Sequence, residues 1–370
     1  MKKILYISSL YPTDKMPSYG IFVKRCEEGL IQNGFDLIKI VLNYKFRGII
    51  GKILEYLKFY IKIIKAGFLE NYDIIYGHYP SHICFPLILV SLSRKTKIVL
   101  NVHGGDLIPE NKYIGLSYNL FFIKILSFFL SRADLIVSPS KHFYDILTQK
   151  YKVKKEKIFI SPSGGVNRFF FHPLPSVNFE KQKLKLSDKF VIGYISRIDK
   201  KKGWHIYLEA LKRLRNNGMI KNIHGLIVGA GPDLSELTDK INEYKLENDI
   251  TYITQVNPES LVDYYNILDI FIFPTFKDSL GLVGIEAMAC GIPVIGSIEG
   301  GLKDYIVEGE NGFFFQTGND LELTQKIEYY YQLDQQSKQQ LKDNALKTSE
   351  LFEFQNISRT LANKINNLPE

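Results

Sequence analysis

Short apolar runs alternate with longer amphipathic stretches along the chain, and this alternation limits its possible folds more than any other feature. In the first half, the pattern predicts strands at 3–9, 37–43, 74–78, 98–103, 135–138 and 158–162. It predicts helices between them at 21–33, 48–69, 81–93, 116–131 and 141–151. Strands that are apolar along their whole length and are joined by helices are typical of a parallel sheet covered on both faces.

A second alternation of the same kind follows, with strands predicted at 191–195, 226–229, 250–253, 270–273 and 293–296. Residues 171–188 between the two are polar and contain two prolines, which indicates a linker. A chain of 370 residues is long enough for two domains. We therefore expect an α/β protein with an N-terminal domain over 1–170, a C-terminal domain over 189–350 and a terminal segment over 351–370.

The composition indicates the kind of partner without choosing it. The formal net charge of +8 favours an anionic partner, whether nucleic acid, a phosphate ligand or a membrane surface. Cys26, Cys84 and Cys290 lie far apart without metal-ligand spacing, which favours a reduced cytoplasmic protein. The first residues predict a strand rather than a signal peptide, and the apolar stretch 113–130 is interrupted by polar residues, so we expect a buried helix there.

Residues 273–297 carry the chemistry that points most clearly to a ligand. A strand-like run ends at Pro274, a loop contains Asp278, and a short helix predicted over 282–290 contains Glu286. The unpaired N–H groups at a helix N-terminus suit a phosphate. Two nearby carboxylates suit vicinal hydroxyls, since carboxylate oxygens accept hydrogen bonds. A nucleotide-sugar offers both a diphosphate and a sugar.

This stretch resembles the signature of the retaining family 4 glycosyltransferases of GT-B fold, also called glycosyl transferases group 1. In that signature, two acids with seven residues between them lead into EAMACGxPV; here the acids are Asp278 and Glu286, and EAMACGIPV stands at 286–294. The resemblance covers nearly the whole chain. It implies two Rossmann-like domains facing each other across a cleft, with the segment 351–370 packing back on the N-terminal domain.

The resemblance also implies a role for each part of this stretch. Glu286 would accept hydrogen bonds from the nucleotide ribose, and Asp278 would contact hydroxyls of the transferred sugar. Because the commonest family pattern has glutamate at the first position, the shorter Asp278 bears on which sugar is chosen. Backbone N–H groups between the acids would meet the phosphates, at Ser279, Leu280, Gly281, Leu282 and Val283.

Two further segments are expected to complete the site. A leaving nucleoside diphosphate gains negative charge, so fixed cations beside it lower the barrier, and resemblance assigns this role to Arg197 and Lys202. In the N-terminal domain, His103 resembles the histidine that lies near the transferred sugar in the family. Glycines that would let the backbone approach the donor are Gly20, Gly229, Gly231, Gly300 and Gly301.

The chain contains no Asp-x-Asp pair of the kind that holds a divalent ion in other glycosyltransferases. We therefore expect a hexosyltransferase that works without a metal or a cofactor and uses a UDP- or GDP-sugar as donor. The family implies transfer with retention to a glycan or a polyprenyl-linked acceptor, in surface polysaccharide biosynthesis. The alternatives are an epimerase or phosphorylase of the same architecture, and a non-catalytic binding subunit.

The stretch 44–69 places basic residues among aliphatic and aromatic ones at roughly helical spacing. These residues are Lys45, Arg47, Lys52, Lys58, Lys62 and Lys65. Such a helix either lies on an anionic bilayer or presents an ordinary solvated face. The first alternative predicts peripheral contact with the inner face of the cell membrane. No nucleic acid is expected as a partner, because no recognised binding module is present.

Overall fold

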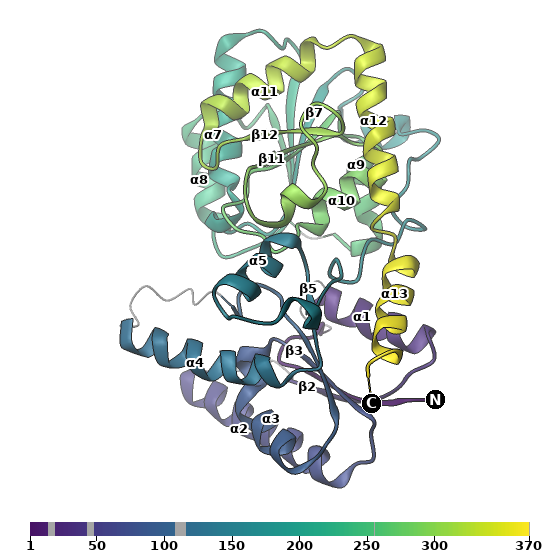
Figure 1. Ribbon diagram of the computed structural model, residues 1–370. Coiled ribbons are helices and arrows are strands. Elements are labelled where there is room, and N and C mark those ends of the chain that lie inside the picture. The colour runs from purple at the N-terminus through teal and green to yellow at the C-terminus, as the bar shows by residue number, and fades with distance from the viewer. Residues whose placement is uncertain (14–18, 43–47, 108–115, 255, 370) are drawn as a thin grey trace. The chain divides into compact units, whose positions relative to one another are not determined.

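The computed structural model describes residues 1–13, 19–42, 48–107, 116–254 and 256–369. The chain divides into two compact units, one formed by Met1–Gly165 with Phe354–Glu370 and the other by Val166–Glu353. Each unit contains a six-stranded parallel sheet with helices packed on it (Figure 1). The predicted fold class, α/β with two Rossmann-like domains, is thereby confirmed.

The sheet of the first unit has the strand order β2-β1-β3-β4-β5-β6. Its strands are β1 (Lys3–Ser8), β2 (Asp36–Val41), β3 (Ile74–His78), β4 (Lys97–Asn101), β5 (Leu135–Ser138) and β6 (Ile158–Ile160). The helices of this unit are α1 (Ile21–Gln32), α2 (Gly48–Leu69), α3 (Pro80–Ser93), α4 (Leu116–Arg132), α5 (Lys141–Gln149), the 3₁₀ turn η1 (Lys155–Lys157) and α13 (Phe354–Asn366). Strand β2 lies on one side of β1, and the following strands β3 to β6 lie on the other side. The topological switch point therefore lies between β1 and β3.

The sheet of the second unit has the strand order β12-β11-β10-β7-β8-β9. Its strands are β7 (Phe190–Ile195), β8 (Ile223–Val228), β9 (Ile250–Ile253), β10 (Ile270–Phe273), β11 (Val294–Ser297) and β12 (Gly312–Phe315). The α-helices are α6 (Asn178–Lys183), α7 (Trp204–Asn217), α8 (Leu234–Glu243), α9 (Leu261–Asn266), α10 (Leu282–Ala289), α11 (Asp320–Gln332) and α12 (Gln335–Glu350). The 3₁₀ turns are η2 (Lys200–Lys202), η3 (Pro258–Ser260) and η4 (Gly300–Asp304). Here the switch point lies between β7 and β10.

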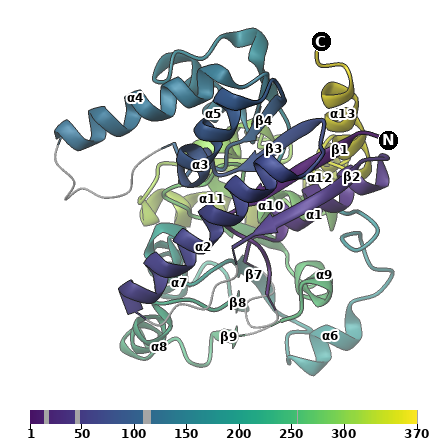
Figure 2. The same cartoon turned by 90° about the horizontal axis from the view of Figure 1, so that it is seen from below.

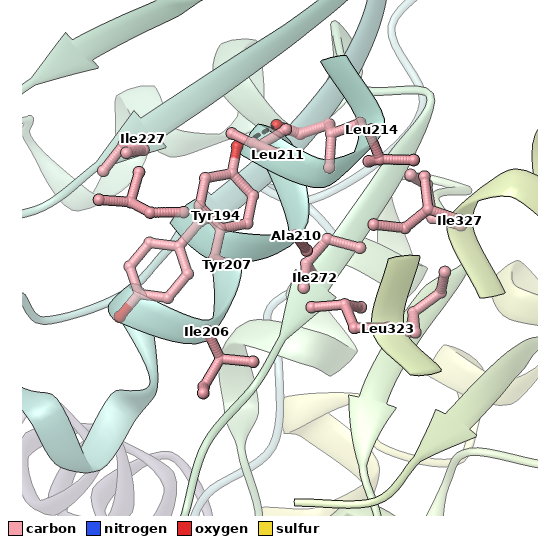
Figure 3. Close-up of a cluster of buried hydrophobic side chains, with 14 of the residues drawn as sticks. Tyr194, Ile206, Tyr207, Ala210, Leu211, Leu214, Ile227, Ile272, Leu323 and Ile327 are labelled. Carbon is pink, nitrogen blue, oxygen red and sulfur yellow. Dashed lines mark hydrogen bonds between the residues drawn. The ribbon is translucent and has the colours of Figure 1, made fainter. Parts of the chain in front are cut away.

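Both sheets bury apolar side chains on their two faces. In β7, Ile192 and Tyr194 belong to one core cluster, whereas Val191 and Ile195 belong to the other. Figure 3 shows part of the first of these clusters, where side chains of α7 and α11 meet those of the sheet. Alternate side chains of a strand point to opposite faces, so full burial of both sets requires an apolar residue at every position.

The last helix, α13, belongs to the first unit, where it packs on α1 (Figures 1 and 2). A Cβ on Gly29 of α1 would lie 2.5 Å from Cβ of Ser358, so the two helices approach closely at this glycine. Leu361 and Ile365 are buried in the core of that unit. The terminal helix is therefore a structural part of the N-terminal sheet's covering layer.

Two segments differ from the expectation. Residues 171–188 were expected to be a linker, but Phe171 and Leu186 are buried in a core cluster of the second unit and α6 lies between them. These two apolar side chains, with Val177 and Leu184 packed against the same cluster, fix the segment to the unit although many of its other residues are polar. Strand β12 was not predicted; it forms the edge of its sheet and pairs with β11.

No helix in the described part of the chain is both long and apolar enough to cross a membrane.

Candidate active site

In the second unit, two predicted site residues lie in direct contact. Lys202 follows β7 and Asp278 follows β10, so they come from the two loops that flank the switch point. The Nζ of Lys202 lies 2.6 Å from Oδ2 of Asp278, and the two side chains are 21% and 16% exposed. Open parallel sheets bind ligands outside the carboxyl ends of the strands at this point. The structure thus brings a cation and a carboxylate together where a ligand is expected.

Backbone contacts hold these two loops together. Gly203 has a φ of +75°, and a Cβ there would lie 1.9 Å from the carbonyl oxygen of Pro274. The N–H of Phe276 donates to the carbonyl oxygen of Lys201 at 2.8 Å. Only glycine fits at position 203, because any other residue would combine an unfavourable φ with a backbone clash. The position of Lys202 is therefore fixed by its immediate neighbours.

Arg197, the second predicted cation, has a different partner. Its Nη2 lies 2.7 Å from Oδ2 of Asp199, and its side chain is 53% exposed. The other oxygen of Asp199 accepts from the N–H of Lys201 at 3.0 Å and thereby caps η2. Arg197 thus stands on the same loop as Lys202, but it is paired with an acid that sequence analysis did not single out.

Helix α10 begins at Leu282, shortly after Asp278, as expected. Gly281 starts the helix with a φ of +84°, and a Cβ there would lie 2.4 Å from the ring of Phe273. Leu282 and Val283 form the first turn, whose N–H groups have no acceptor within the helix. The N–H of Leu280, by contrast, points at Oδ1 of Asp278 at 3.4 Å. Among the described residues, the N–H groups of Leu282 and Val283 have no acceptor, so they suit an anion.

Glu286 lies one turn further into α10 and is only 6% exposed. The hydroxyl of Tyr265 donates to its Oε2 at 3.3 Å. Burial, together with the charge of Glu286, raises the pKa of Tyr265 well above its usual value, so this phenol stays protonated and remains a donor. The carboxylate is thus held by a hydrogen bond inside the unit. Ribose binding by Glu286 stays a prediction.

The glycines predicted near the donor each lie against another loop of the same unit. A Cβ on Gly229 would lie 1.9 Å from the carbonyl oxygen of Ser196, and one on Gly231 would lie 2.0 Å from that of Ile198. Gly300 meets the carbonyl oxygen of Asp278 in the same way, at 2.1 Å, and Gly301 meets that of Ser279 at 2.3 Å. All four glycines therefore shape the loops that carry Arg197 and Asp278. Contact with a donor stays a prediction.

In the first unit, His103 forms a pair with a second histidine. It follows β4, and its Nε2 lies 2.7 Å from Nδ1 of His78 at the end of β3. The two rings are stacked with an interplanar angle of 11°. Burial lowers the pKa of His103 to about 3, and burial together with the neighbouring His103 lowers the pKa of His78 well below its usual value. Both imidazoles are therefore neutral at physiological pH.

The backbone around His103 is tightly arranged. Its N–H donates to Oδ1 of Asp106 at 3.0 Å. Gly104 has a φ of +99°, and a Cβ there would lie 2.8 Å from the ring of Phe143. At Gly105, by contrast, a Cβ would meet nothing within 4 Å. The turn after His103 thus requires a glycine at position 104, whereas position 105 has room for a side chain.

Gly20 has a φ of +77° at the start of α1, close to the backbone of Tyr11. Part of its predicted loop, residues 14–18, lies outside the described residues. Its contact with donor phosphates stays a prediction.

Sequence analysis missed His78 and its neighbour Tyr79. Tyr79 has a φ of +55°, which is rare for a residue other than glycine, and its ring lies 4.7 Å from that of His103. Strain of this kind is often found at functional sites. The sequence offered one signal, which is that both residues stand at the end of the predicted strand 74–78. The structure shows that this strand, β3, flanks the switch point of the first sheet.

Within the described ranges, no group of three or more histidine, cysteine, aspartate or glutamate side chains is arranged to hold a metal ion. The metal-independent reaction stays a prediction that depends on the chemistry of Lys202, Arg197 and α10.

The described chain thus consists of two parallel α/β units, and each has candidate site residues at the carboxyl ends of its strands. The family description "Glycosyl transferases group 1" matches residues 176–348, and "Glycosyltransferase Family 4" matches residues 22–164. The two matches cover one unit each and together most of the chain. The chain belongs to the family 4 glycosyltransferases of GT-B fold, which confirms the resemblance read from the sequence.

Individual proteins are similar over part or all of the chain. The capsular polysaccharide biosynthesis glycosyltransferase CapM of Staphylococcus aureus is 31% identical over 56% of this chain and 54% of its own length. The N-acetyl-alpha-D-glucosaminyl L-malate synthase of Bacillus anthracis is 22% identical over 70% of this chain and 65% of its own length. The matched region thus spans between half and two thirds of these two relatives.

Two solved structures share the fold of the whole chain. Sucrose-phosphate synthase of Thermosynechococcus elongatus has a TM-score of 0.81 with 19% identity and covers 100% of this chain and 99% of its own. HepE of Anabaena, solved in complex with UDP and glucose, has a TM-score of 0.75 with 20% identity and covers 100% of both chains.

Proposed function

We propose that the protein transfers a hexose-type sugar from a UDP- or GDP-sugar to a glycan or lipid-linked oligosaccharide acceptor, with retention and without a metal ion. The observation that carries this proposal is the contact between Lys202 and Asp278 beside the start of α10. A nucleotide-sugar needs a cation and free N–H groups for its diphosphate, and carboxylates for its hydroxyls. The second unit has all of these within adjoining loops.

The diphosphate would lie at the N-terminus of α10, where first-turn N–H groups and the helix dipole attract an anion. Lys202 and Arg197 would turn from their present carboxylates to the phosphate oxygens. Both cations act most strongly in the transition state, because the bond from the anomeric carbon to the phosphate oxygen breaks and charge builds up on the leaving diphosphate. This arrangement replaces the divalent ion that other glycosyltransferases use.

The acceptor hydroxyl would attack the anomeric carbon from the face that the diphosphate leaves, which retains the anomeric configuration. Its proton would pass to the departing phosphate oxygen, so no separate base is required. His103 would serve as a neutral hydrogen-bond partner of the transferred sugar, since its low pKa keeps the imidazole uncharged. Asp278 would accept hydrogen bonds from the sugar hydroxyls once Lys202 has moved to the diphosphate.

The similar proteins support the same substrate class. HepE was solved with UDP and with UDP-glucose. CapM is described as acting in capsular polysaccharide biosynthesis. A role in surface polysaccharide assembly, at the cytoplasmic side of the membrane, is our extension of these likenesses to this chain.

Membrane contact would occur through α2. This helix packs with Phe59, Ile63 and Gly67 buried, and a Cβ on Gly67 would lie 2.4 Å from Val90 of α3, so α2 and α3 lie side by side (Figure 2). Its other faces expose aliphatic side chains at Ile49, Ile50, Ile53, Leu54, Leu57 and Ile61. Four exposed lysines accompany them: Lys52, Lys58, Lys62 and Lys65. Lys45 and Arg47 lie outside the described residues.

An exposed face that is both aliphatic and basic suits an anionic bilayer better than water. We therefore propose peripheral binding of α2 to anionic lipid, close to a lipid-linked acceptor. Full-length protein should sediment with phosphatidylglycerol vesicles at low salt and much less with phosphatidylcholine vesicles. Ile50→Asp should weaken this binding, whereas Ile31→Asp, at an exposed isoleucine of α1, should not. Equal behaviour of the two variants would exclude α2 as the docking surface.

The transferase proposal is tested by ligand binding and then by turnover. UDP-, GDP- and other nucleotide-sugars are screened for a rise in the melting temperature, since a ligand that binds the native state stabilises it. The sugar that stabilises the protein is then offered with lipid-linked acceptors, and the anomeric configuration of the product is read by NMR. Binding should persist in EDTA. If no nucleotide-sugar raised the melting temperature, the proposal would fail at its first step.

A further inference from the structure

His78 is buried beside His103, the histidine that is predicted to bind the sugar. It is fully buried at the end of β3, with ring centroids of Tyr6 at 4.9 Å, Tyr76 at 5.1 Å and His103 at 5.0 Å. The tyrosine hydroxyls have other partners: that of Tyr6 donates to the carbonyl oxygen of Val23, and that of Tyr76 accepts from the amide of Asn101. The polar contact of His78 is therefore with His103.

The hydrogen bond between the two imidazoles has two possible directions, because a neutral histidine carries one N–H and one lone pair. If His78 donates from Nδ1, its Nε2 carries a lone pair and His103 holds its proton on Nδ1. If His103 donates from Nε2, then His78 carries its proton on Nε2 and His103 has a lone pair on Nδ1. The first direction makes His103 a donor toward a ligand, and the second makes it an acceptor.

The surroundings of His78 Nε2 distinguish these directions. Within the described residues this atom is buried and has no hydrogen-bond partner. A buried N–H without an acceptor is rarer in proteins than an acceptor with an unused lone pair. The direction that leaves the lone pair on Nε2 is therefore favoured, and it requires His78 to donate from Nδ1.

We propose that His78 is a positioning residue: its Nδ1–H donates to Nε2 of His103 and holds His103 as the tautomer whose Nδ1–H donates to a hydroxyl of the transferred sugar. The tautomer follows from the contacts of the free protein, whereas the sugar contact rests on the function proposed above. Among the residues that the structure describes, Nδ1 of His103 is the ring nitrogen not engaged by His78.

The rings around His103 support this role, because they limit its rotation. Phe22 and Tyr79 each lie with a ring centroid 4.7 Å from that of His103, and His78 stacks on it almost in parallel. The left-handed backbone of Tyr79, directly after His78, brings its ring to this position. An imidazole held in one orientation and one tautomer can offer a sugar a donor at a fixed place.

The tautomer is read directly by ¹⁵N NMR of histidine-labelled, ligand-free protein, where protonated and lone-pair nitrogens differ clearly in chemical shift. The signals missing from His103→Gln identify His103 among the seven histidines. We expect Nδ1 of His103 to be protonated and Nε2 to carry the lone pair. The reverse pattern would overturn the proposal. Because no substrate is present, this result is independent of whether the protein transfers a sugar.

Two variants test the positioning role in the active protein. His78→Phe keeps a ring of similar size but removes the donor, so the NMR signals of His103 should become those of a tautomer mixture and kcat should fall about tenfold, with a smaller change in KM. His78→Asn keeps an N–H donor near the position of Nδ1 and should restore most of kcat and the single tautomer. An unchanged His103 spectrum in folded His78→Phe would contradict the proposal. If His78→Phe does not fold, the wild-type spectrum and His78→Asn decide the question.

Discussion

Replacing Asp278 with asparagine should change nucleotide binding and sugar transfer in opposite directions. In the free protein Lys202 is bound to Asp278 at 2.6 Å, so it must leave this carboxylate before it can meet a diphosphate. A hydrogen bond between charged groups contributes about 1.5–3 kcal/mol, and the partial exposure of both side chains places this one toward the lower end. Asp278→Asn removes most of that competing interaction while leaving the shape of the side chain unchanged.

The expected gain in affinity for free UDP or GDP is about 1.4 kcal/mol, which corresponds to about tenfold tighter binding. Turnover of the nucleotide-sugar should fall by at least as much, because the amide is a weaker acceptor for the sugar hydroxyls. Isothermal titration calorimetry with the free nucleotide and steady-state kinetics with the full donor measure the two effects separately. Unchanged or weaker binding of the free nucleotide by Asp278→Asn would refute the idea that Lys202 is exchanged between acid and diphosphate.

A matched control is available at the other end of the same 3₁₀ turn. Lys200 pairs with Glu236 at 2.7 Å, and both side chains are about half exposed. Glu236→Gln removes one negative charge from the same unit without touching Lys202. It should leave nucleotide affinity nearly unchanged, so a gain equal to that of Asp278→Asn would indicate a general effect of net charge.

Three further outcomes are expected. Glu286→Ala should weaken nucleotide binding and reduce turnover at least about tenfold, equivalent to about 1.4 kcal/mol; unchanged kinetics would remove Glu286 from the site. Gly203→Ala should lower the free energy of unfolding by more than about 1 kcal/mol and reduce activity, because its Cβ would meet the carbonyl oxygen of Pro274 at 1.9 Å. The control is Gly218→Ala: Gly218 has a similar φ, but a Cβ there would meet nothing within 4 Å, so this variant should lose stability and keep its activity. Because burial lowers the pKa of His103 to about 3, the unfolded protein takes up a proton on this imidazole at a higher pH than the folded protein does, so the free energy of unfolding falls by about 2 kcal/mol between pH 7 and pH 5. This contribution is complete above about pH 6.5 and is lost toward pH 3. Urea titrations at pH 7 and pH 5 should show a smaller loss in His103→Gln than in wild type, and equal losses would contradict the burial of a neutral His103.

The fold was predictable from sequence because both sheets are parallel and covered on two faces. Each strand of such a sheet is a continuous apolar run, as Val191 to Ile195 illustrates, and continuous runs separated by helices are easily recognised. Strand β12 was missed since it begins at Gly312 and lies at a sheet edge. The segment that was expected to be a linker was misjudged because two buried side chains outweigh many polar neighbours.

Individual residues of the candidate site could be singled out from the sequence, but the contacts between them could not. Asp278 and Lys202 were each identified from local motifs, yet they are 76 positions apart and only the strand order brings their loops together. His78 was missed for a different reason: a histidine at the end of an apolar strand gives no local signal of function. Its role emerges only from the ring of His103, which reaches it from the adjacent strand.

The placement of α13 has a consequence for how the protein is made. The first unit needs Leu361 and Ile365 to cover its α1 side, but these residues leave the ribosome only after the whole second unit has been synthesised. Until then, α1 presents an uncovered apolar strip around Gly29 and Leu30 to the surrounding solvent. The first unit therefore completes its fold only after α13 has been made, and a nonsense mutation that removed α13 would damage the unit that contains β1 to β6.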